Sequence, residues 1–281
     1  MRLAVSVVAA AFLFSTVAFA QSPWDKTYNV SSRPNLQVEV DDASVRVRSC
    51  GGCQSVHIHV EPHGQDMNRW RISEMQGGSG IRFAMKHKED RSFFGMGWHG
   101  QSPEIIVETP GETDLNVRSG DGSLGVAGLR GSVDLKTGDG SVHVDETDGQ
   151  LRIVTGDGSV LVRRAAGTLN ATTGDGSMNL EGRLSQLDAH TGDGSIRLDL
   201  LPGSTLQSSS RVTTGDGSIA MTVPHDLHAD VQVSTGDGHI ANGLSMQTSV
   251  NDQHNVRGLM NGGGPTLRVH SGDGSIALSA R

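Results

Sequence analysis

The stretch that decides the fold is residues 137–172, TGDGSVHVDETDGQLRIV followed by TGDGSVLVRRAAGTLNAT, which are two copies of one 18-residue unit. Each copy opens with the motif [ST]-Gly-Asp-Gly-[SH] and an apolar residue. The motif occurs eight times in the chain, and its aspartates are Asp121, Asp139, Asp157, Asp175, Asp193, Asp216, Asp237 and Asp273. The first four intervals between them are 18 residues, and the next are 23, 21 and 36. A fixed period of this length indicates a stacked repeat.

The apolar residues keep phase with these aspartates. In most units, alternating apolar residues lie three and five positions after the Asp, such as Val142 and Val144, and six and four positions before the next, such as Leu151 and Ile153. Each unit is therefore two short strands with one face inward. Antiparallel hairpins or the coils of a parallel solenoid both fit this pattern. We favour the solenoid, because identical turns then stack on themselves.

We therefore expect an all-β chain forming a single elongated parallel β-solenoid of 18-residue, two-strand coils over residues 119–281. Two stretches break the rhythm. Residues 201–204, Leu-Pro-Gly-Ser, are predicted to bulge as a loop. Residues 242–265 are polar and glycine-rich, lack the motif expected at Asn255, and fit either a degenerate coil or a long loop.

Residues 21–118 show the same alternation without the motif, for example at Leu36, Val38 and Val40. We expect this region to supply a cap and the first irregular coils. The segment 86–102 contains Phe93, Phe94 and Trp98 among glycines. It is predicted either to fold back over an open end of the core or to insert into a ligand or partner.

The first twenty residues have the pattern of a signal peptide: a basic start, an apolar run from Leu3 to Phe14, and Ala18-Phe19-Ala20 before the cleavage point. That run is too short to span a bilayer comfortably, and no second run of spanning length follows. We expect an exported, soluble protein that is not membrane-spanning and is periplasmic or extracellular at the cell surface.

The composition excludes several classes of function. Glycine accounts for 38 of 281 residues and aromatic residues for 4%, which argues against a membrane bundle or a large aromatic-rich enzyme core. The formal net charge is −8, so the chain lacks the basic character of nucleic-acid-binding proteins.

The two cysteines form a Cys50-Gly51-Gly52-Cys53 motif between two predicted strands. In an oxidising compartment this spacing predicts a disulfide that closes a turn. The alternative is a metal site that combines both cysteines with His57 and His59, which share one strand face.

Stacked turns would place the eight motif aspartates in a ladder, with like charges about 5 Å apart that repel by roughly 1 kcal/mol even in water. We expect local compensation, in which each Asp accepts backbone N–H groups in an Asx-type turn, the flanking glycines adopt positive φ, and the following Ser adds a hydroxyl. The alternative is a row of bound Ca²⁺ ions, which makes all eight aspartates calcium candidates.

No sequence motif for catalysis is present: HExxH, G-x-S-x-G and the P-loop are absent. We predict no catalytic residues and no required cofactor. The best enzyme alternative is a β-helix enzyme acting on polysaccharides, with Asp carboxylates in a groove as acid and base.

The chain resembles a bacterial family of exported β-strand-repeat proteins called "putative adhesins". The resemblance rests on the signal peptide followed by paired strands, on the segment Ile105–Pro110 that leads to Leu115–Gly122, and on the Gly-Asp-Gly-Ser coils. It covers nearly the whole mature chain and implies a β-solenoid at the cell envelope with no established enzymatic residues. We expect a non-enzymatic interaction module whose partner is a glycan, an envelope protein or a second copy of itself.

Overall fold

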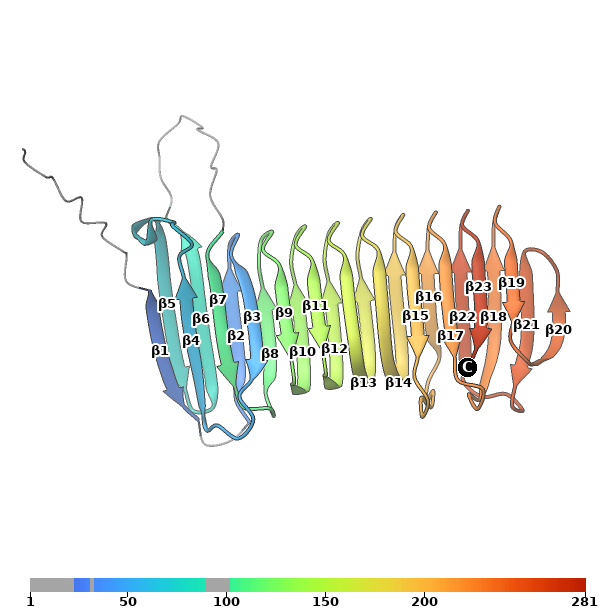
Figure 1. Ribbon diagram of the computed structural model, residues 1–281, viewed down its shortest axis with the longest axis horizontal. Coiled ribbons are helices and arrows are strands. Elements are labelled where there is room, and N and C mark those ends of the chain that lie inside the picture. The colour runs from blue at the N-terminus through green and yellow to red at the C-terminus, as the bar shows by residue number, and fades with distance from the viewer. Residues whose placement is uncertain (1–22, 31–32, 89–101) are drawn as a thin grey trace, which may run out of the picture.

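The computed structural model describes residues 23–30, 33–88 and 102–281. In these residues the regular structure is β-strand, apart from the short 3-10 helix η1 (Met67–Arg69). The all-β prediction is confirmed. The strands lie across the long axis of an elongated rod (Figure 1). The predicted signal peptide, residues 1–20, lies outside the described residues.

The strands form two facing layers, which the long strands β13 and β14 join into one continuous sheet. In spatial order, layer 1 contains β5 (Trp70–Gly77), β6 (Gly80–His87), β2 (Asn35–Val40), β8 (Asp114–Arg118), β10 (Arg130–Lys136), β12 (Asp148–Val154), the second halves of β13 (Val160–Thr172) and β14 (Met178–Thr191), β16 (Ser210–Thr214), β22 (Thr266–Ser271), β18 (Ala229–Thr235), β21 (Asn255–Met260) and β20 (Gln247–Asn251). Layer 2 contains β1 (Trp24–Asn29), β4 (Ser55–Glu61), β7 (Glu104–Thr109), β3 (Ser44–Ser49), β9 (Leu124–Ala127), β11 (Val142–Asp145), the first halves of β13 and β14, β15 (Ile196–Leu200), β17 (Ile219–Val223), β23 (Ile276–Ala280) and β19 (Ile240–Gly243).

Strands of the repeat pair in parallel, in the arrangement favoured above. Val133 pairs with Leu151 in layer 1, and Val142 pairs with Val160 in layer 2, each at an offset of 18 residues. The chain passes from layer 1 to layer 2 through each Gly-Asp-Gly turn and returns along the opposite edge of the rod. Equivalent residues of neighbouring coils therefore stack in rows at about 4.8 Å spacing.

The core lies between the two layers. The apolar positions that keep phase with the aspartates are buried, apart from Ile240 of the terminal strand β19, which is partly buried; Leu135, Val144 and Ile153 have no exposed surface. The residues between them point outward, as the burial pattern of β12 shows. The alternation predicted from the sequence is confirmed over the whole repeat.

The coils are not stacked in chain order at either end of the rod. The β2–β3 coil lies between the β6–β7 and β8–β9 coils. At the other end, the last coil, β22–β23, lies between the β16–β17 and β18–β19 coils, so the C-terminus sits inside the stack (Figure 1). The spatial order of the last three turns is therefore Asp216, Asp273, Asp237. A stack in chain order would have given Asp216, Asp237, Asp273. The last coil carries the same inward pattern as its neighbours, so it completes both layers there.

Residues 242–265 form neither a degenerate coil nor a long loop. They contain β20 and β21, an antiparallel hairpin, and β21 pairs antiparallel with β18. The segment before the hairpin brings Leu244, which is 9% exposed, and the partly buried Met246 against the core. Antiparallel strands end the parallel stacking and cover the open end of the rod, which would otherwise be an edge for aggregation.

The opposite end is closed by antiparallel β1 and β5 and by aromatic side chains. The rings of Trp24 and Phe83 lie 5.2 Å apart, and Trp70 is 6% exposed. This supports a capping role for the N-terminal region. The aromatic residues Phe93–Trp98 of the predicted 86–102 loop lie outside the described residues.

The loop predicted at 201–204 is present and continues to β16. Ser204 and Leu206 turn back into the structure and are 4% and 8% exposed. Gly203 has a φ of +85°, which a glycine adopts without strain.

Candidate functional site

The motif glycines allow close backbone contact between neighbouring coils. A Cβ built on Gly158 would lie 2.6 Å from the carbonyl carbon of Gly140 and closer still to its oxygen. The same contact recurs from Gly176 to Gly158, at 2.7 Å to the carbonyl carbon. None of the motif glycines adopts positive φ, so the expectation about their φ was wrong. Glycine is required here because no side chain fits between the coils.

The buried hydroxyl of the motif's first residue holds each turn to its neighbour. Thr155 Oγ1 lies 2.9 Å from the carbonyl oxygen of Gly138 and 3.0 Å from that of Gly140, and its single O–H donates to this pair. Equivalent hydroxyl-to-carbonyl bonds are made by Ser119, Thr137, Thr173, Thr191, Thr214, Thr235 and Ser271. The sequence analysis had assigned a hydroxyl hydrogen bond to the Ser that follows Gly-Asp-Gly. The structure gives it to the residue before Gly-Asp-Gly.

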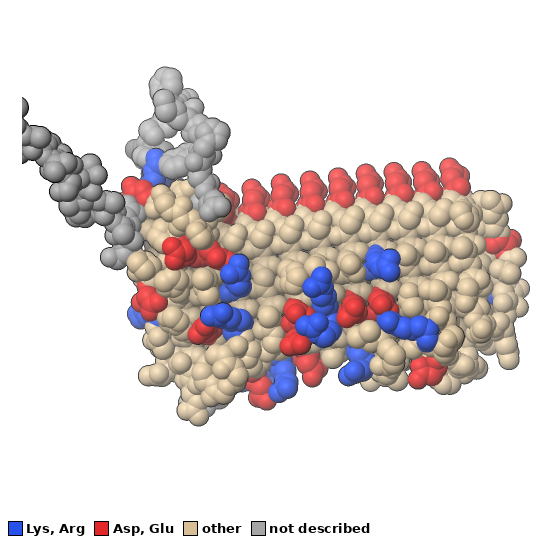
Figure 2. All heavy atoms as spheres, in the orientation of Figure 1, with Lys and Arg blue, Asp and Glu red and all other residues tan. Residues whose placement is uncertain are grey.

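The motif aspartates take little part in holding the turns. Asp121 Oδ1 accepts a bond from the backbone N–H of Asp139 at 3.4 Å, but this bond joins two coils and is not an Asx turn. The predicted Asx turns do not form, because the Thr or Ser hydroxyl and the inter-coil backbone bonds already satisfy the turn. All eight carboxylates are exposed, and none forms an ion pair with a described residue. The predicted ladder is present as a continuous row of acidic side chains along one edge of the rod (Figure 2).

The acidic edge has one more member that the sequence analysis missed. The turn between β2 and β3 contains Asp42, and a Cβ on Gly120 of the next coil would meet its carboxylate. A signal was present in the sequence: Leu36 and Val38 lie six and four residues before Asp42, and Val45 and Val47 lie three and five after it. The motif itself is absent there, because Val40 occupies the place of its first Ser or Thr, and Asp41 and Ala43 occupy the places of its two glycines.

Metal ligation at the edge remains a prediction. Among the residues that the structure describes, no group of three or more His, Cys, Asp or Glu side chains is placed so as to hold a metal ion. Any calcium site on the ladder would therefore combine one or two carboxylates with backbone oxygens or water.

The cysteines and histidines named as an alternative metal site have other partners. Cys50 and Cys53 are joined by a disulfide in the turn between β3 and β4. His57 Nε2 and His59 Nδ1 lie 2.9 and 3.0 Å from the two carboxylate oxygens of Asp25 on β1. The hydrogen bonds from these histidines lower the pKa of Asp25, and the bond to Asp25 raises the pKa of His59. This cluster attaches the terminal strand of layer 2.

The outer face of layer 2 has a shallow hollow of about 570 Å³ over Gly125 and Ala127. Its carboxylates are engaged in ion pairs: Glu104 with Arg46 at 2.8 Å, and Asp145 with Arg164 at 2.7 Å. A glycosidase needs one carboxyl group free to donate a proton and another free to attack or activate water. The paired state of these two carboxylates gives no support to that chemistry.

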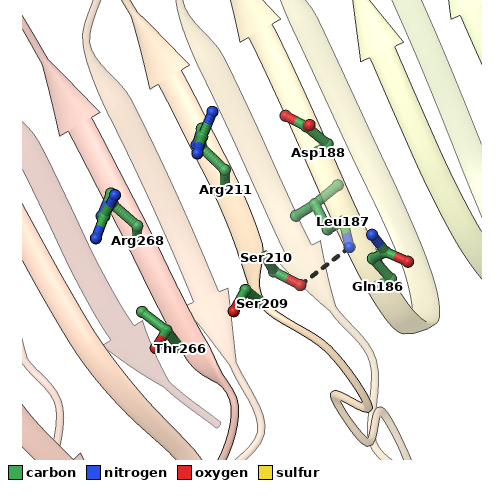
Figure 3. Close-up of a pocket in the computed structure, with 8 residues that line it drawn as sticks. All are labelled: Gln186, Leu187, Asp188, Ser209, Ser210, Arg211, Thr266 and Arg268. Atoms are coloured by element: carbon green, nitrogen blue, oxygen red, sulfur yellow. Dashed lines mark hydrogen bonds between the residues drawn. The ribbon is translucent and has the colours of Figure 1, made fainter.

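The outer face of layer 1 has a second hollow, of about 270 Å³, where the 201–209 loop interrupts the regular coils. Figure 3 shows Asp188, Arg211 and Arg268 projecting side by side from β14, β16 and β22 above this hollow. The sequence analysis did not identify these residues, because Arg211 and Arg268 are 57 positions apart in the chain.

In the described part of the chain, the structure contains no helix that is both long and apolar enough to cross a membrane.

Comparison with solved structures shows the fold. A "putative lipid binding protein" from Parabacteroides distasonis ATCC 8503 matches with a TM-score of 0.53 and 13% identity, over 92% of this chain and 97% of that one. A "putative adhesin" from Parabacteroides merdae ATCC 43184 matches with a TM-score of 0.48 and 10% identity, over 92% and 97%. A "putative adhesin" from Bacteroides fragilis NCTC 9343 gives 0.41 and 12%, over 93% and 98%.

A search of curated proteins gave no match. The family model described as Toastrack DUF4097 matches residues 34–279, which include nearly every strand of the rod. The chain therefore belongs to the Toastrack DUF4097 family.

Proposed function

We propose that this protein is a non-enzymatic interaction module of the bacterial cell envelope, exported after removal of residues 1–20, which uses a rigid β-solenoid to present a straight acidic edge to a partner. The observation that carries the proposal is the row of eight exposed motif carboxylates at one-strand spacing, none of which forms an ion pair with a described residue (Figure 2).

The electrostatic repulsion between these carboxylates supports a role for them beyond folding. Neighbouring like charges about 5 Å apart disfavour the folded state by up to roughly 1 kcal/mol per pair before salt screening. The glycines and the Thr or Ser hydroxyls already hold the turns, so the fold does not need the carboxylates. An edge with one sign of charge attracts a partner that carries basic groups and fixes its register along the rod.

The test is binding of the purified protein to isolated envelopes of the producing bacterium, compared between wild type and the triple variant Asp157→Asn, Asp175→Asn, Asp193→Asn. We expect the triple variant to stay folded and to bind at least tenfold more weakly. A matched control, Asp134→Asn, Glu181→Gln, Asp226→Asn, removes the same charge from other surfaces and should bind as wild type does. Equal binding by both triple variants would contradict the proposal.

The enzymatic alternative is tested separately on a panel of polysaccharides. Turnover that is lost on changing a single residue outside the repeat would replace the proposed function with a polysaccharide-acting one. The proposal expects no turnover above that of a heat-denatured sample.

A further inference from the structure

The hollow on the outer face of layer 1 contains a charge arrangement that the fold does not require. Arg211 on β16 and Arg268 on β22 are direct neighbours in the parallel register, with Asp188 of β14 on the other side of Arg211. Both arginine side chains are exposed. Arg268 donates a hydrogen bond to Gln232 at 3.2 Å, and neither arginine forms an ion pair with a described residue.

Two other outward arginines of the rod give a comparison. On layer 1, Arg118 of β8 lies between Glu39 of β2 and Lys136 of β10, so an arginine beside a second cation occurs elsewhere in the rod. On layer 2, Arg48 of β3 lies opposite Glu108 of β7 in register, and its Nε donates to that carboxylate at 3.0 Å. In the hollow, the corresponding neighbour of Arg211 is a second arginine. Like charges directly opposite each other destabilise a sheet. The Arg211–Arg268 pair differs from Arg118 and Lys136 in that it borders a hollow where the regular coils are interrupted.

The pair exists only because the coils are out of chain order. If β18 followed β16, Arg211 would lie beside Gln232, which occupies the equivalent position on β18. The inserted last coil places Arg268 between them. Gln232 in turn lies beside Arg257 of β21, so a third guanidinium continues the row.

The backbone around the pair is also irregular. The repeat interval that contains the 201–209 loop is 23 residues instead of 18. There the hydroxyl of Ser210 accepts the backbone N–H of Leu187 at 3.0 Å (Figure 3). The resulting hollow of about 270 Å³ is lined by Gln186, Ser209 and Thr266 beside the charged residues. Loops that interrupt a regular scaffold are common sites of binding.

We propose that this hollow binds an acidic sugar unit of a glycan, in which a carboxylate or sulfate ester lies on Arg211 and Arg268. The planar guanidinium fork suits these oxyanions. Two guanidinium groups and the Asp188 carboxylate leave a net charge of +1, which matches a monoanion better than a phosphate dianion. The hydroxyls of Ser209 and Thr266 and the amide of Gln186 supply partners for sugar hydroxyls. This inference concerns a different surface from the acidic edge and does not depend on it.

The test is isothermal titration calorimetry of the purified protein with four probes: a galacturonate oligomer, its fully methyl-esterified neutral form, a sulfated galactose oligomer, and inorganic sulfate. We expect at least one acidic oligomer to bind with a Kd in the millimolar range or tighter, and the neutral oligomer to bind at least tenfold more weakly. The tighter of the two acidic oligomers identifies the anionic group. Failure of both acidic oligomers would overturn the inference, as would inorganic sulfate binding as tightly as they do.

The double variant Arg211→Gln, Arg268→Gln should lose binding at least tenfold. Its melting temperature should not fall, because the change removes a like-charge pair. The control is Arg152→Gln, another exposed arginine in the equivalent position of β12, which should bind as wild type does. Undiminished binding by the double variant would overturn the inference. The triple Asp→Asn edge variant should bind the oligomers as tightly as wild type does. The proposal for this hollow and the proposal for the acidic edge can therefore be refuted independently.

Discussion

Replacement of Gly158 by Ala tests the packing of the turns most sharply. The new Cβ would lie 2.6 Å from the Gly140 carbonyl carbon and 2.7 Å from Thr155 Oγ1, whereas real Cβ contacts stay beyond 3.0 Å. The atoms it would meet belong to the Gly140 backbone and to the buried Thr155 hydroxyl, so neither can rotate away. The two coils must part by more than 0.4 Å. This parting stretches the bonds that Thr155 makes to the neighbouring turn.

The expected cost is at the upper end of the 1–3 kcal/mol range for overpacked interiors, about 3 kcal/mol. For a chain of this size that corresponds to a melting temperature lower by about 6–12 °C. The assay is equilibrium urea unfolding followed by circular dichroism, with a thermal scan beside it.

Two further glycine variants make the result interpretable. Gly125→Ala is the control, since its Cβ would lie 3.7 Å from the nearest atom, Arg46 Cγ, and the change should be neutral or stabilise by up to about 1 kcal/mol. Gly238→Ala introduces the same clash in a coil with a parallel neighbour on one side only, at 2.6 Å from the Gly274 carbonyl carbon. That coil can tilt outward, so its cost should be smaller than that of Gly158→Ala. Equal stability of Gly158→Ala and Gly125→Ala would refute the close-contact explanation.

Three other predictions concern the turn hydroxyl, the edge carboxylates and the attachment of β1. Thr155→Val should destabilise by about 1–3 kcal/mol in urea unfolding, because it removes the hydroxyl donor from the buried bond to the Gly140 carbonyl, whereas the Gly138 carbonyl keeps its bond from the Gly156 N–H. Thr155→Ser should retain most of the stability; equal losses in both variants would contradict a role for the hydroxyl. Asp157→Asn should raise the melting temperature slightly at low ionic strength and leave it unchanged at 1 M salt, since it relieves a screened repulsion; a loss of stability in low salt would mean that the carboxylate supports the turn. Attachment of β1 should be strongest between about pH 4 and pH 6.5. Asp25 raises the pKa of His59 above 6.5, so the stabilisation of β1 by His59 is full below pH 6.5 and is lost as the pH rises through the folded pKa. The pKa of Asp25 is lowered below 3.8, so the stabilisation of β1 by Asp25 is lost only as the pH falls through the folded pKa of that carboxyl group. Hydrogen exchange of the β1 amides should show greater protection in this pH range, by well below 1 kcal/mol, because both side chains are partly exposed. Asp25→Asn should remove this pH dependence; a pH dependence that survives in the variant would belong to other groups.

The sequence predicted the regular part of the rod because one period repeats there. Residues such as Val142, Val144, Leu151 and Ile153 alternate in phase with the aspartates, and only an inward-facing strand pair satisfies that phase. The parallel arrangement could be favoured on the same ground, since identical turns stack only when strands are parallel. The turn chemistry was assigned wrongly because Gly-Asp-Gly is also typical of positive-φ turns. The motif needs glycine because neighbouring coils approach closely, and the sequence of a single unit does not show the distance between coils.

The ends and the layer 1 hollow could not be predicted for a different reason. The order in which coils stack depends on contacts between segments far apart in the chain. β22 and β18 both bury alternating apolar residues, Leu267 and Val269 in β22 and Val231 and Val233 in β18, so this pattern does not tell which of them follows β16. Arg211 and Arg268 become neighbours only through that choice. The antiparallel hairpin of β20 and β21 likewise lacks the repeat pattern, so the sequence marked residues 242–265 as irregular without giving their structure.

The central claim is that the repeat separates two tasks: glycine and the Thr or Ser hydroxyl build the turn, and aspartate provides the surface. Scanning calorimetry of the wild type and of the Asp157→Asn, Asp175→Asn, Asp193→Asn variant, each in low salt with Ca²⁺ and with chelator, tests it most directly. We expect the variant to melt at or above the wild-type temperature, and Ca²⁺ to shift neither melting temperature by more than about 1 °C. A variant that melts well below the wild type, or a wild type that is strongly stabilised by Ca²⁺ while the variant is not, would make the carboxylates part of the fold and contradict the claim.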